Sequence, residues 1–194
     1  MGSNRHYPEE APVHRVTVDA FQIDRTPVTN RQFKEFVRTT SHRTFAELSP
    51  DPQDHPGALP HMLYAGSLVF SSKQNLCADG FDRTSPVTAF PPNDYGVHDL
   101  IGNVWEWTSD WYSQKHEADA PKACCIPENP RGGCEDESFD PCLPYIRNPR
   151  KVLKGGSHLC APNYCRRYRP AARDAEPVDT SASHVGFRCI KREA

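Results

Sequence analysis

The pattern that decides the fold stands at residues 155–173, which read GGSHLCAPNYCRRYRPAAR. Its two cysteines, Cys160 and Cys165, have four residues between them, on a loop that contains glycine and proline. Two thiolates at this spacing can bind one soft metal ion or close into a disulfide, and a linear two-thiolate site suits Cu(I). The spacing alone leaves these alternatives open.

Positive charge surrounds the two cysteines. A cation near a cysteine lowers the pKa of the thiol and favours the thiolate, which binds metals and attacks electrophiles. This charge favours redox or metal chemistry, but the residue types alone leave a structural disulfide or inert thiols equally open. The arginines in this stretch are Arg166, Arg167, Arg169 and Arg173.

Short predicted strands lie on both sides of this stretch. Residues 151–157 and 185–190 flank it directly. Residues 104–112 alternate aromatic and polar side chains, which is typical of a strand that packs large rings on one face. Residues 13–23 alternate apolar and polar side chains and predict an early strand, and residues 86–90 predict a further short one.

One helix is predicted, together with long irregular segments. Thr29 and Asn30 can cap a short amphipathic helix that continues through Arg38. Residues 46–67 are rich in Ser, Pro, Asp and Gly and predict a surface loop. Residues 113–150 have no sustained period and predict a long excursion or lid.

The composition indicates one loop-rich α+β domain over residues 1–194, because 19 prolines and 11 glycines favour many turns. The 23 Lys and Arg balance 25 Asp and Glu, so no charge excess favours nucleic acid or an anionic membrane as a partner. No stretch approaches the roughly 18 apolar residues of a membrane span, and the first residues lack the apolar region of a signal peptide. We therefore expect a cytoplasmic chain.

The chain has more cysteines than a cytosolic chain of this size usually carries, at irregular spacing. In a cytosolic protein, such thiols more often bind metal or catalyse than form a disulfide framework. The eight are Cys77, Cys124, Cys125, Cys134, Cys142, Cys160, Cys165 and Cys189.

Residues 155–173, followed by SASHVGFRC at 181–189, resemble the C-terminal signature of formylglycine-generating enzymes. The wider superfamily shares GNVWEW, here at 102–107, and the GFR triplet, but generally lacks the two-cysteine block. The resemblance implies the family's C-type-lectin-like α+β fold, loop-rich and with little regular secondary structure. Further agreement lies at residues 1–3, 8–12, 16–18, 26–30 and 84–87.

This resemblance implies an oxidase that converts the cysteine of a Cys-x-Pro-x-Arg motif in a sulfatase into Cα-formylglycine. The implied co-substrates are molecular oxygen and a thiol reductant. By family analogy, Cys160 and Cys165 bind Cu(I), and the substrate thiol joins them as a third sulfur ligand in an open coordination position.

The resemblance also assigns roles around the two cysteines. Ser157 matches an active-site serine that positions oxygen or substrate, and its alternative is a turn hydroxyl after two glycines. Trp105 and Tyr164 match residues of the substrate pocket, although aromatic side chains are core residues about as often. His184 stands where some relatives carry Asn.

Calcium is the second implied cofactor. The segment 99–106 resembles the family's calcium loop, with carboxylates from Asp99 and Glu106 and backbone carbonyls from Gly102 and Val104. Hard oxygen ligands suit Ca²⁺, whereas the plain alternative is a solvated Asp and a Glu that caps a turn. Half of another calcium site is matched by Asp79 and Phe81.

The chain departs from the family near residues 70–74. Members of the family carry a long central block at this point, with a core helix and part of the substrate groove, and this sequence lacks it. The resemblance also leads us to expect a further strand before residue 1. Loss of the block predicts exposed apolar surface and weaker folding. It also removes the family's partner for the Cys189 thiol, and the remaining cysteines can pair locally or stay free.

We expect the oxidase to act as a monomer. Two rival functions remain open beside it. One is a non-catalytic ligand-binding module on the same fold, with Cys160 and Cys165 as a disulfide. The other is an iron-dependent sulfoxide synthase. It needs three histidines at a metal-binding spacing, and the nine histidines of this chain lack the His-x-x-x-His-x-Glu type of pattern.

Overall fold

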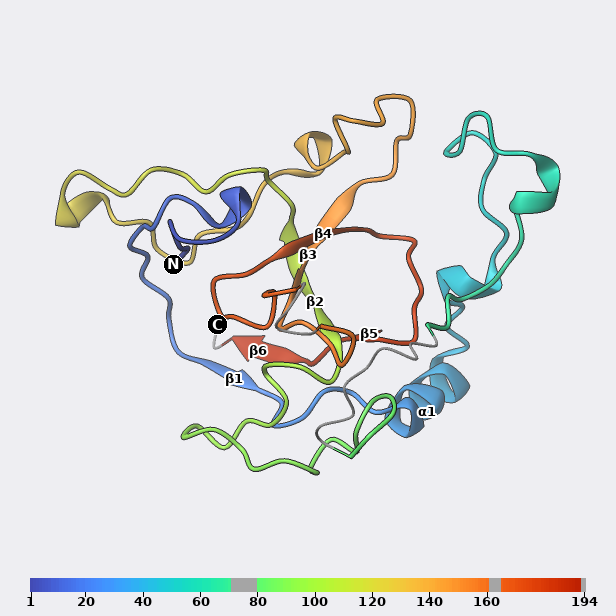
Figure 1. Cartoon of the computed structure of the whole chain (residues 1–194), viewed down its shortest axis with the longest axis horizontal. Coiled ribbons are helices and arrows are strands. Elements are labelled where there is room, and N and C mark those ends of the chain that lie inside the picture. Colours follow the sequence, from blue (N-terminus) through green and yellow to red (C-terminus); the bar gives the residue numbers. More distant parts are fainter. Residues whose placement is uncertain (71–79, 161–164, 193–194) are drawn as a thin grey trace.

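A mixed four-stranded sheet forms the centre of the computed structural model, which describes residues 1–70, 80–160 and 165–192 (Figure 1). Its strand order is β4-β3-β2-β5. Strand β2 (Trp105–Trp111) pairs antiparallel with β3 (Arg150–Lys154) and parallel with the short β5 (Val185–Gly186), and β3 pairs antiparallel with β4 (Asp174–Pro177). The β2–β3 register places Trp107 opposite Leu153.

A second sheet joins the two ends of the chain. Strand β1 (Phe21–Ile23) pairs antiparallel with β6 (Ile190–Arg192). Figure 1 shows this ribbon beside the β5 end of the four-stranded sheet. Because residues 187–189 alone separate β5 from β6, the C-terminal segment links both sheets.

Helix α1 (Asn30–Thr40) forms where the sequence predicts it. The Thr29 hydroxyl accepts a hydrogen bond from the Gln32 backbone N–H, and the Gln32 side chain accepts one from the Thr29 N–H, which completes a capping box. Ser41 ends the helix in the left-handed conformation, with φ of 55°. No residue of α1 is buried, so the helix covers little of the core.

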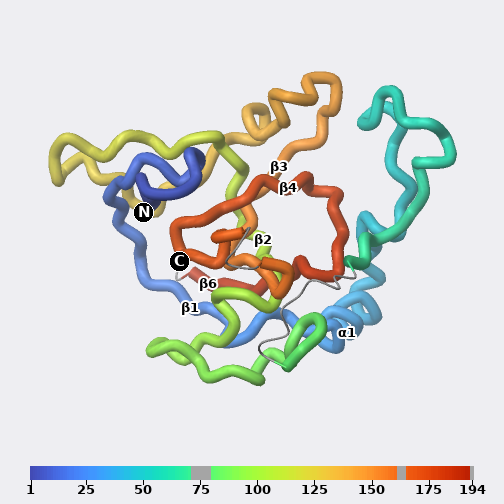
Figure 2. The backbone as a smooth tube through the Cα atoms, in the orientation of Figure 1, coloured from blue at the N-terminus to red at the C-terminus, as the bar shows by residue number. Residues whose placement is uncertain are grey.

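Irregular chain makes up most of the rest. Figure 2 shows the segments around residues 42–66 and 113–149 running outside the sheets, as the composition predicts. Among the described residues, no helix is both long and apolar enough to cross a bilayer. The short 3₁₀ helices are Pro8–Glu10, Phe45–Glu47, Pro60–Met62, Ala123–Cys125 and Glu135–Glu137.

The core is small for a chain of this length. Leu153 is 2% exposed, Ala172 is fully buried and Trp105 is 6% exposed, so the core lies around β2 and β3. Many large apolar side chains remain exposed, among them Leu68 and Val69 directly before the expected break with the family. The described residues therefore expose apolar surface, as predicted.

Three strand predictions need correction. Of residues 13–23, only the last three form a strand, because only they have a partner strand; Thr17 makes an isolated bridge to Glu128. Residues 86–90 form a turn, closed by a hydrogen bond from the Ala89 N–H to the Pro86 carbonyl, and no strand. The predicted strand at 185–190 is divided between the two sheets.

Candidate functional site

Two glycines turn the chain from β3 into the cysteine loop. Gly155 and Gly156 have φ of 92° and 70°, a region that side chains rarely adopt, and a Cβ on Gly156 would lie 3.1 Å from the Tyr168 backbone. The next turn is fixed to the start of β2, because the His158 N–H donates to the Asn103 carbonyl over 3.0 Å. The loop is thus held in place at its base.

The structure brings Cys160 and Cys165 together. Their Sγ atoms are 3.0 Å apart, and both side chains are half-buried free thiols. Burial and the hydrogen bond from Cys165 raise the pKa of Cys160 to about 12. The pair is close enough to share one soft metal ion or to be oxidised to a disulfide.

The prediction that the arginines lower the thiol pKa is wrong for Cys160. Carboxylates neutralise two of these arginines. Arg167 lies 2.9 Å from Glu9, near the start of the chain, and 3.5 Å from Asp174 on β4. Arg169 forms an ion pair with Glu10, which is fully buried. Burial of the thiol therefore outweighs cationic stabilisation of the thiolate.

Ser157 is buried beside the cysteine loop. It is 3% exposed, and its hydroxyl accepts a hydrogen bond from the Leu159 N–H while its carbonyl accepts one from the Cys160 N–H at 2.9 Å. The serine thus shapes the turn that presents Cys160. This contact agrees with the turn-hydroxyl alternative and also keeps Ser157 next to the thiol.

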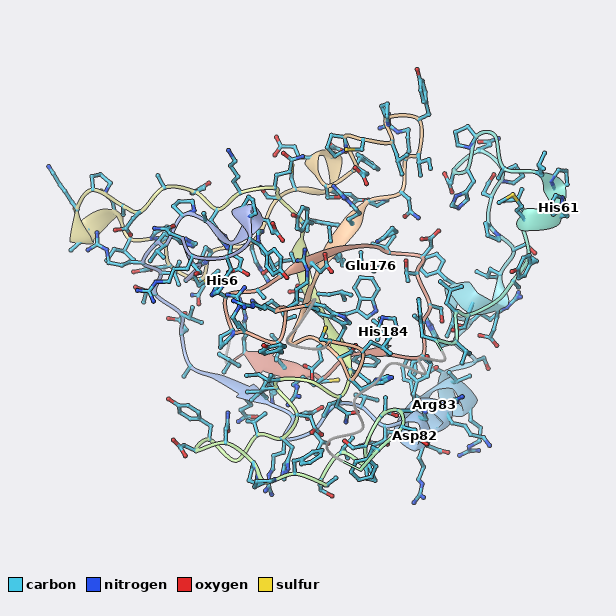
Figure 3. The ribbon with its side chains drawn as sticks, viewed as in Figure 1. His6, His61, Asp82, Arg83, Glu176 and His184 are labelled. Carbon is cyan, nitrogen blue, oxygen red and sulfur yellow. The ribbon has the colours of Figure 1, made fainter. Side chains whose placement is uncertain are left out.

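Trp105 and His184 lie together at the start of β2. The Trp105 N–H donates to the His184 carbonyl over 2.8 Å. His184 is half-buried and is labelled near the middle of the view in Figure 3, and its ring packs edge-on against Phe70 at 4.7 Å. Burial, then the charge of His158, lowers the pKa of His184, and its buried Nδ1 has no partner among the described residues. Tyr164 lies outside the described residues.

In the predicted calcium loop, one carboxylate has an oxygen that is free to bind an ion, and the other is already paired with an arginine. Asp99 has a buried Oδ2 without a hydrogen-bond partner, and burial raises the pKa of this carboxyl. Both oxygens of Glu106 accept hydrogen bonds from Arg188, one of them over 2.7 Å. The residues therefore fit Ca²⁺ only in part, because Glu106 must leave Arg188 to bind it.

Gly102 and Val104 lie on either side of Asn103 in this loop, and the Gly102 N–H donates to the Gly155 carbonyl over 2.9 Å. Phe81 packs edge-on against Phe90 with ring centroids 6.0 Å apart, and Asp79 lies outside the described residues. Within residues 1–70, 80–160 and 165–192, no three His, Cys, Asp or Glu side chains gather as a metal site.

Sequence reasoning missed two groups. Arg188, the partner of Glu106, belongs to the GFR triplet, so a signal was present in the sequence. A cavity of about 1310 Å³ is lined in part by His14, His116, Lys154 and Arg173, and it does not include either cysteine of the pair. No sequence pattern predicted this cavity, because the residues that line it are far apart along the chain.

Comparison with known proteins agrees with this geometry. A sequence model of the sulfatase-modifying factor enzyme 1-like domain matches residues 1–68 and 56–193. The chain is 32% identical to the formylglycine-generating enzyme of Mycobacterium tuberculosis over 290 residues, covering 98% of this chain and 93% of the relative. That alignment is longer than the chain itself, so part of the relative has no counterpart here.

Two further proteins define the fold and the range of the family. The structure of PvdO from Pseudomonas aeruginosa has a TM-score of 0.66 at 17% identity, covering all of this chain and 90% of PvdO, which confirms the predicted α+β fold. The inactive Cα-formylglycine-generating enzyme 2 of Bos taurus is 28% identical, covering 93% of this chain and 80% of that protein. The chain belongs to the family of sulfatase-modifying factor enzyme 1-like domains.

Proposed function

We propose that this chain is a formylglycine-generating enzyme that acts on the cysteine of a Cys-x-Pro-x-Arg motif in a sulfatase. The relatives named as formylglycine-generating enzymes support a function in sulfatase modification. The observation that carries the proposal is the 3.0 Å separation of the Cys160 and Cys165 thiols on a loop held by Gly155, Gly156 and Asn103.

Cys160 and Cys165 would hold Cu(I), because two soft sulfur donors that face each other suit this ion. When bound, copper supplies a site at which oxygen and the substrate thiol react. The conversion balances when the substrate CH₂–SH, one O₂, and two electrons with two protons from a thiol reductant give an aldehyde, H₂S and water. Both the oxidant and the reductant come from outside the chain.

The chain's own residues position these reactants. Ser157 shapes the turn at Cys160, and Trp105 and His184 lie where β2 begins. Burial lowers the pKa of His184 and so favours its neutral ring, whose Nδ1 has no hydrogen-bond partner among the described residues and can accept a hydrogen bond. We propose Asp99 as the open ligand of a structural Ca²⁺ at this loop, while Glu106 stays paired with Arg188.

The test is mass spectrometry of a Cys-x-Pro-x-Arg peptide incubated with the chain, Cu(I), oxygen and a thiol reductant. We expect an aldehyde product that is lost in Cys165→Ser. Cys189→Ser is the matched control, because Cys189 is exposed and lies outside the pair. Product in the wild type and in Cys189→Ser, but not in Cys165→Ser, supports the enzyme.

The second candidate is a non-catalytic module in which Cys160 and Cys165 form a disulfide. The closeness of the two thiols favours it, because they can be oxidised to a disulfide, and the raised pKa of Cys160 disfavours a reactive thiolate. Titration of the folded chain with Cu(I) against a competing chelator separates the two functions. Stoichiometric copper binding that Cys165→Ser abolishes contradicts the module. A folded chain that neither binds copper nor forms the aldehyde contradicts the enzyme.

A further inference from the structure

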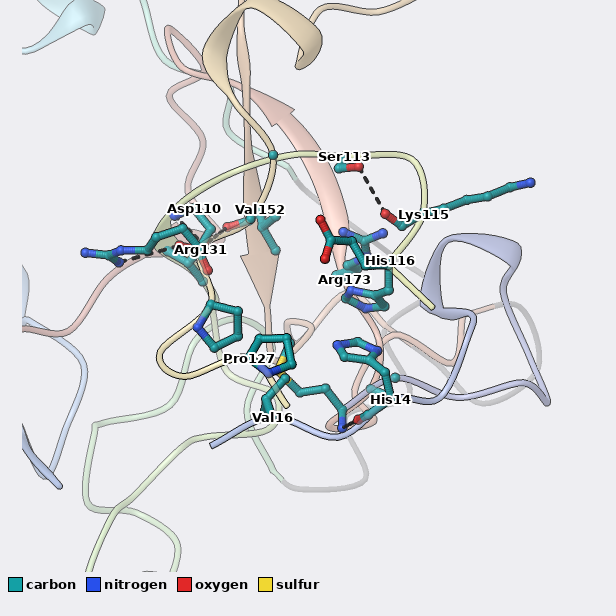
Figure 4. Close-up of a pocket in the computed structure, with 18 of the residues that line it drawn as sticks. His14, Val16, Asp110, Ser113, Lys115, His116, Pro127, Arg131, Val152 and Arg173 are labelled. Atoms are coloured by element: carbon teal, nitrogen blue, oxygen red, sulfur yellow. Dashed lines mark hydrogen bonds and ion pairs between the residues drawn. The ribbon is translucent and has the colours of Figure 1, made fainter. Parts of the chain in front are cut away.

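The large cavity does not include Cys160 or Cys165, and its wall carries histidine, lysine and arginine side chains. Residues near the start of the chain, of β2 and β3, of the segment that follows β2 and of the segment before β4 form this wall. Figure 4 shows His14, His116 and Arg173 together on one side of the cavity, with Asp110 and Arg131 on the other. Asp110 is 3.6 Å from Arg131, so this acid is balanced by its own cation.

Two cations of the wall have no carboxylate partner within the described part of the chain. Lys154 donates from Nζ to the carbonyl oxygens of Pro170 and Ala172, each at 2.6 Å. Arg173 donates from Nε to the Glu9 carbonyl over 2.7 Å. These contacts satisfy some donors but leave both positive charges without an ion pair.

Glu9 and Glu10, whose charges act on Arg173, already pair with other arginines, and two further acids, Glu117 and Glu137, line the cavity. The carboxylate of Glu9 lies 2.9 Å from Arg167, and that of Glu10 pairs with Arg169. Asp174 lies 3.5 Å from Arg167. A partner for Lys154 and Arg173 must therefore be a group other than Glu9, Glu10 or Asp174.

Arg173 gives the sharpest sign of a missing partner. The residue is 5% exposed, and its Nη2 is buried without a hydrogen-bond acceptor among the described residues. A buried cationic N–H without an acceptor is unfavourable, whereas a charge-assisted bond to an anion is strong. Because Arg173 lines the cavity, an anion there would supply the acceptor after a small adjustment of the wall.

The histidines show that the wall already repels positive charge. The rings of His14 and His116 are 4.6 Å apart, and burial, then the charges of Arg173 and His14, lower the pKa of His116 to about 4. Both rings carry an N–H that can donate when neutral. Burial lowers the pKa of Lys154 to about 8, so this side chain is still charged at pH 7.

We propose that this cavity binds a doubly charged tetrahedral oxyanion, phosphate or sulfate, held by Arg173 and Lys154 with His116 beside them. Two unpaired cations match the charge of a dianion, and a monocarboxylate would leave one of them unbalanced. The cavity exceeds the size of one ion, so a phosphate or sulfate group on a larger molecule fits as well as the free ion.

The test is isothermal titration calorimetry of the full chain at pH 7 and constant ionic strength, with chloride as the background anion. The probes are inorganic phosphate, sulfate and phenyl phosphate. We expect saturable binding of tetrahedral oxyanions, and Lys154→Met weakens it by about tenfold because one charge-assisted contact is lost. Tighter binding of phenyl phosphate than of phosphate identifies an ester as the occupant, and equal binding identifies the free ion.

Lys151→Met is the matched control. Lys151 lies on the same strand, donates to the Ser109 carbonyl and stacks on Trp111, but it does not line the cavity. If Lys154→Met fails to fold by circular dichroism, His116→Gln replaces it, and weaker binding is again expected. The proposal is overturned if millimolar phosphate and sulfate give no more heat than chloride, or if Lys151→Met weakens binding as much as the cavity variant.

Discussion

Arg188 holds both carboxylate oxygens of Glu106 and also donates to the backbone carbonyls of His98 and Asp99. The Arg188 side chain is 4% exposed and that of Glu106 is 13% exposed, so this is a buried ion pair. It connects the end of β5 to β2 and to the predicted calcium loop. Loss of either partner leaves a charge that water cannot reach.

We therefore expect Arg188→Met to lower the free energy of unfolding by about 3–5 kcal/mol, measured by urea denaturation. The matched control is Arg38→Met on α1, because Arg38 pairs with Glu35 on the exposed surface. Screening by water makes that loss much smaller. Equal losses in the two variants would show that Glu106 does not depend on Arg188.

Helix α1 depends on its cap rather than on burial, because none of its residues is buried. Thr29→Ala removes the hydroxyl that accepts from the Gln32 N–H, and we expect the helix to lose about 1 kcal/mol. Amide hydrogen exchange within α1 should therefore become roughly fivefold faster. Thr29→Ser keeps the hydroxyl and should exchange like the wild type; faster exchange there would point to the lost methyl group instead.

Sequence periodicity correctly predicted the elements that are specified by their own local pattern of side chains. The aromatic alternation at 104–112 became β2, and the cap at Thr29 began α1. Strand β4 was missed because Asp174–Pro177 has low intrinsic strand preference and forms by pairing with β3. Residues 13–20 have the right alternation, but within the described residues the only β-bridge they make is the isolated one from Thr17 to Glu128, and they have no partner strand. Local sequence cannot reveal this.

The same limit applies to the candidate site. The short spacing and the glycines predicted that Cys160 and Cys165 would meet. The charge around them could not be predicted, because Arg167 and Arg169 are neutralised by Glu9 and Glu10 from the other end of the chain. Burial of the thiol, then its hydrogen bond from Cys165, raises the pKa of Cys160 instead, and only the folded structure shows this burial.

The small core makes each of its apolar residues important. Leu153 is 2% exposed on β3, and Leu153→Ala should lower the free energy of unfolding by about 2–5 kcal/mol. Leu59 is the same residue type at 55% exposure, and Leu59→Ala should change it by less than about 0.5 kcal/mol. Urea denaturation compares the two, and a similar loss at both positions would contradict a core centred on β2 and β3.

His116 should make the fold sensitive to acid. Its pKa is lowered from 6.5 to about 4, first by burial and then by the charges of Arg173, His14 and Lys154. Between these two values the unfolded chain binds a proton that the folded chain refuses, so the free energy of unfolding falls as the pH drops from 6.5 toward 4. In His116→Gln this contribution is absent, and the decline should be shallower.

The measurement is urea denaturation at several pH values in buffers without phosphate or sulfate, because an anion bound near Arg173 would offset the repulsion. His61→Gln is the control, since His61 is exposed in the outlying 3₁₀ helix Pro60–Met62 (Figure 3) and does not line the cavity. Its decline should follow the wild type, because the substitution leaves His116 and the cations around it unchanged. A constant difference in stability between wild type and His116→Gln across this pH range would mean that His116 takes up its proton in the folded chain as readily as in the unfolded one, and that the cavity wall does not repel positive charge.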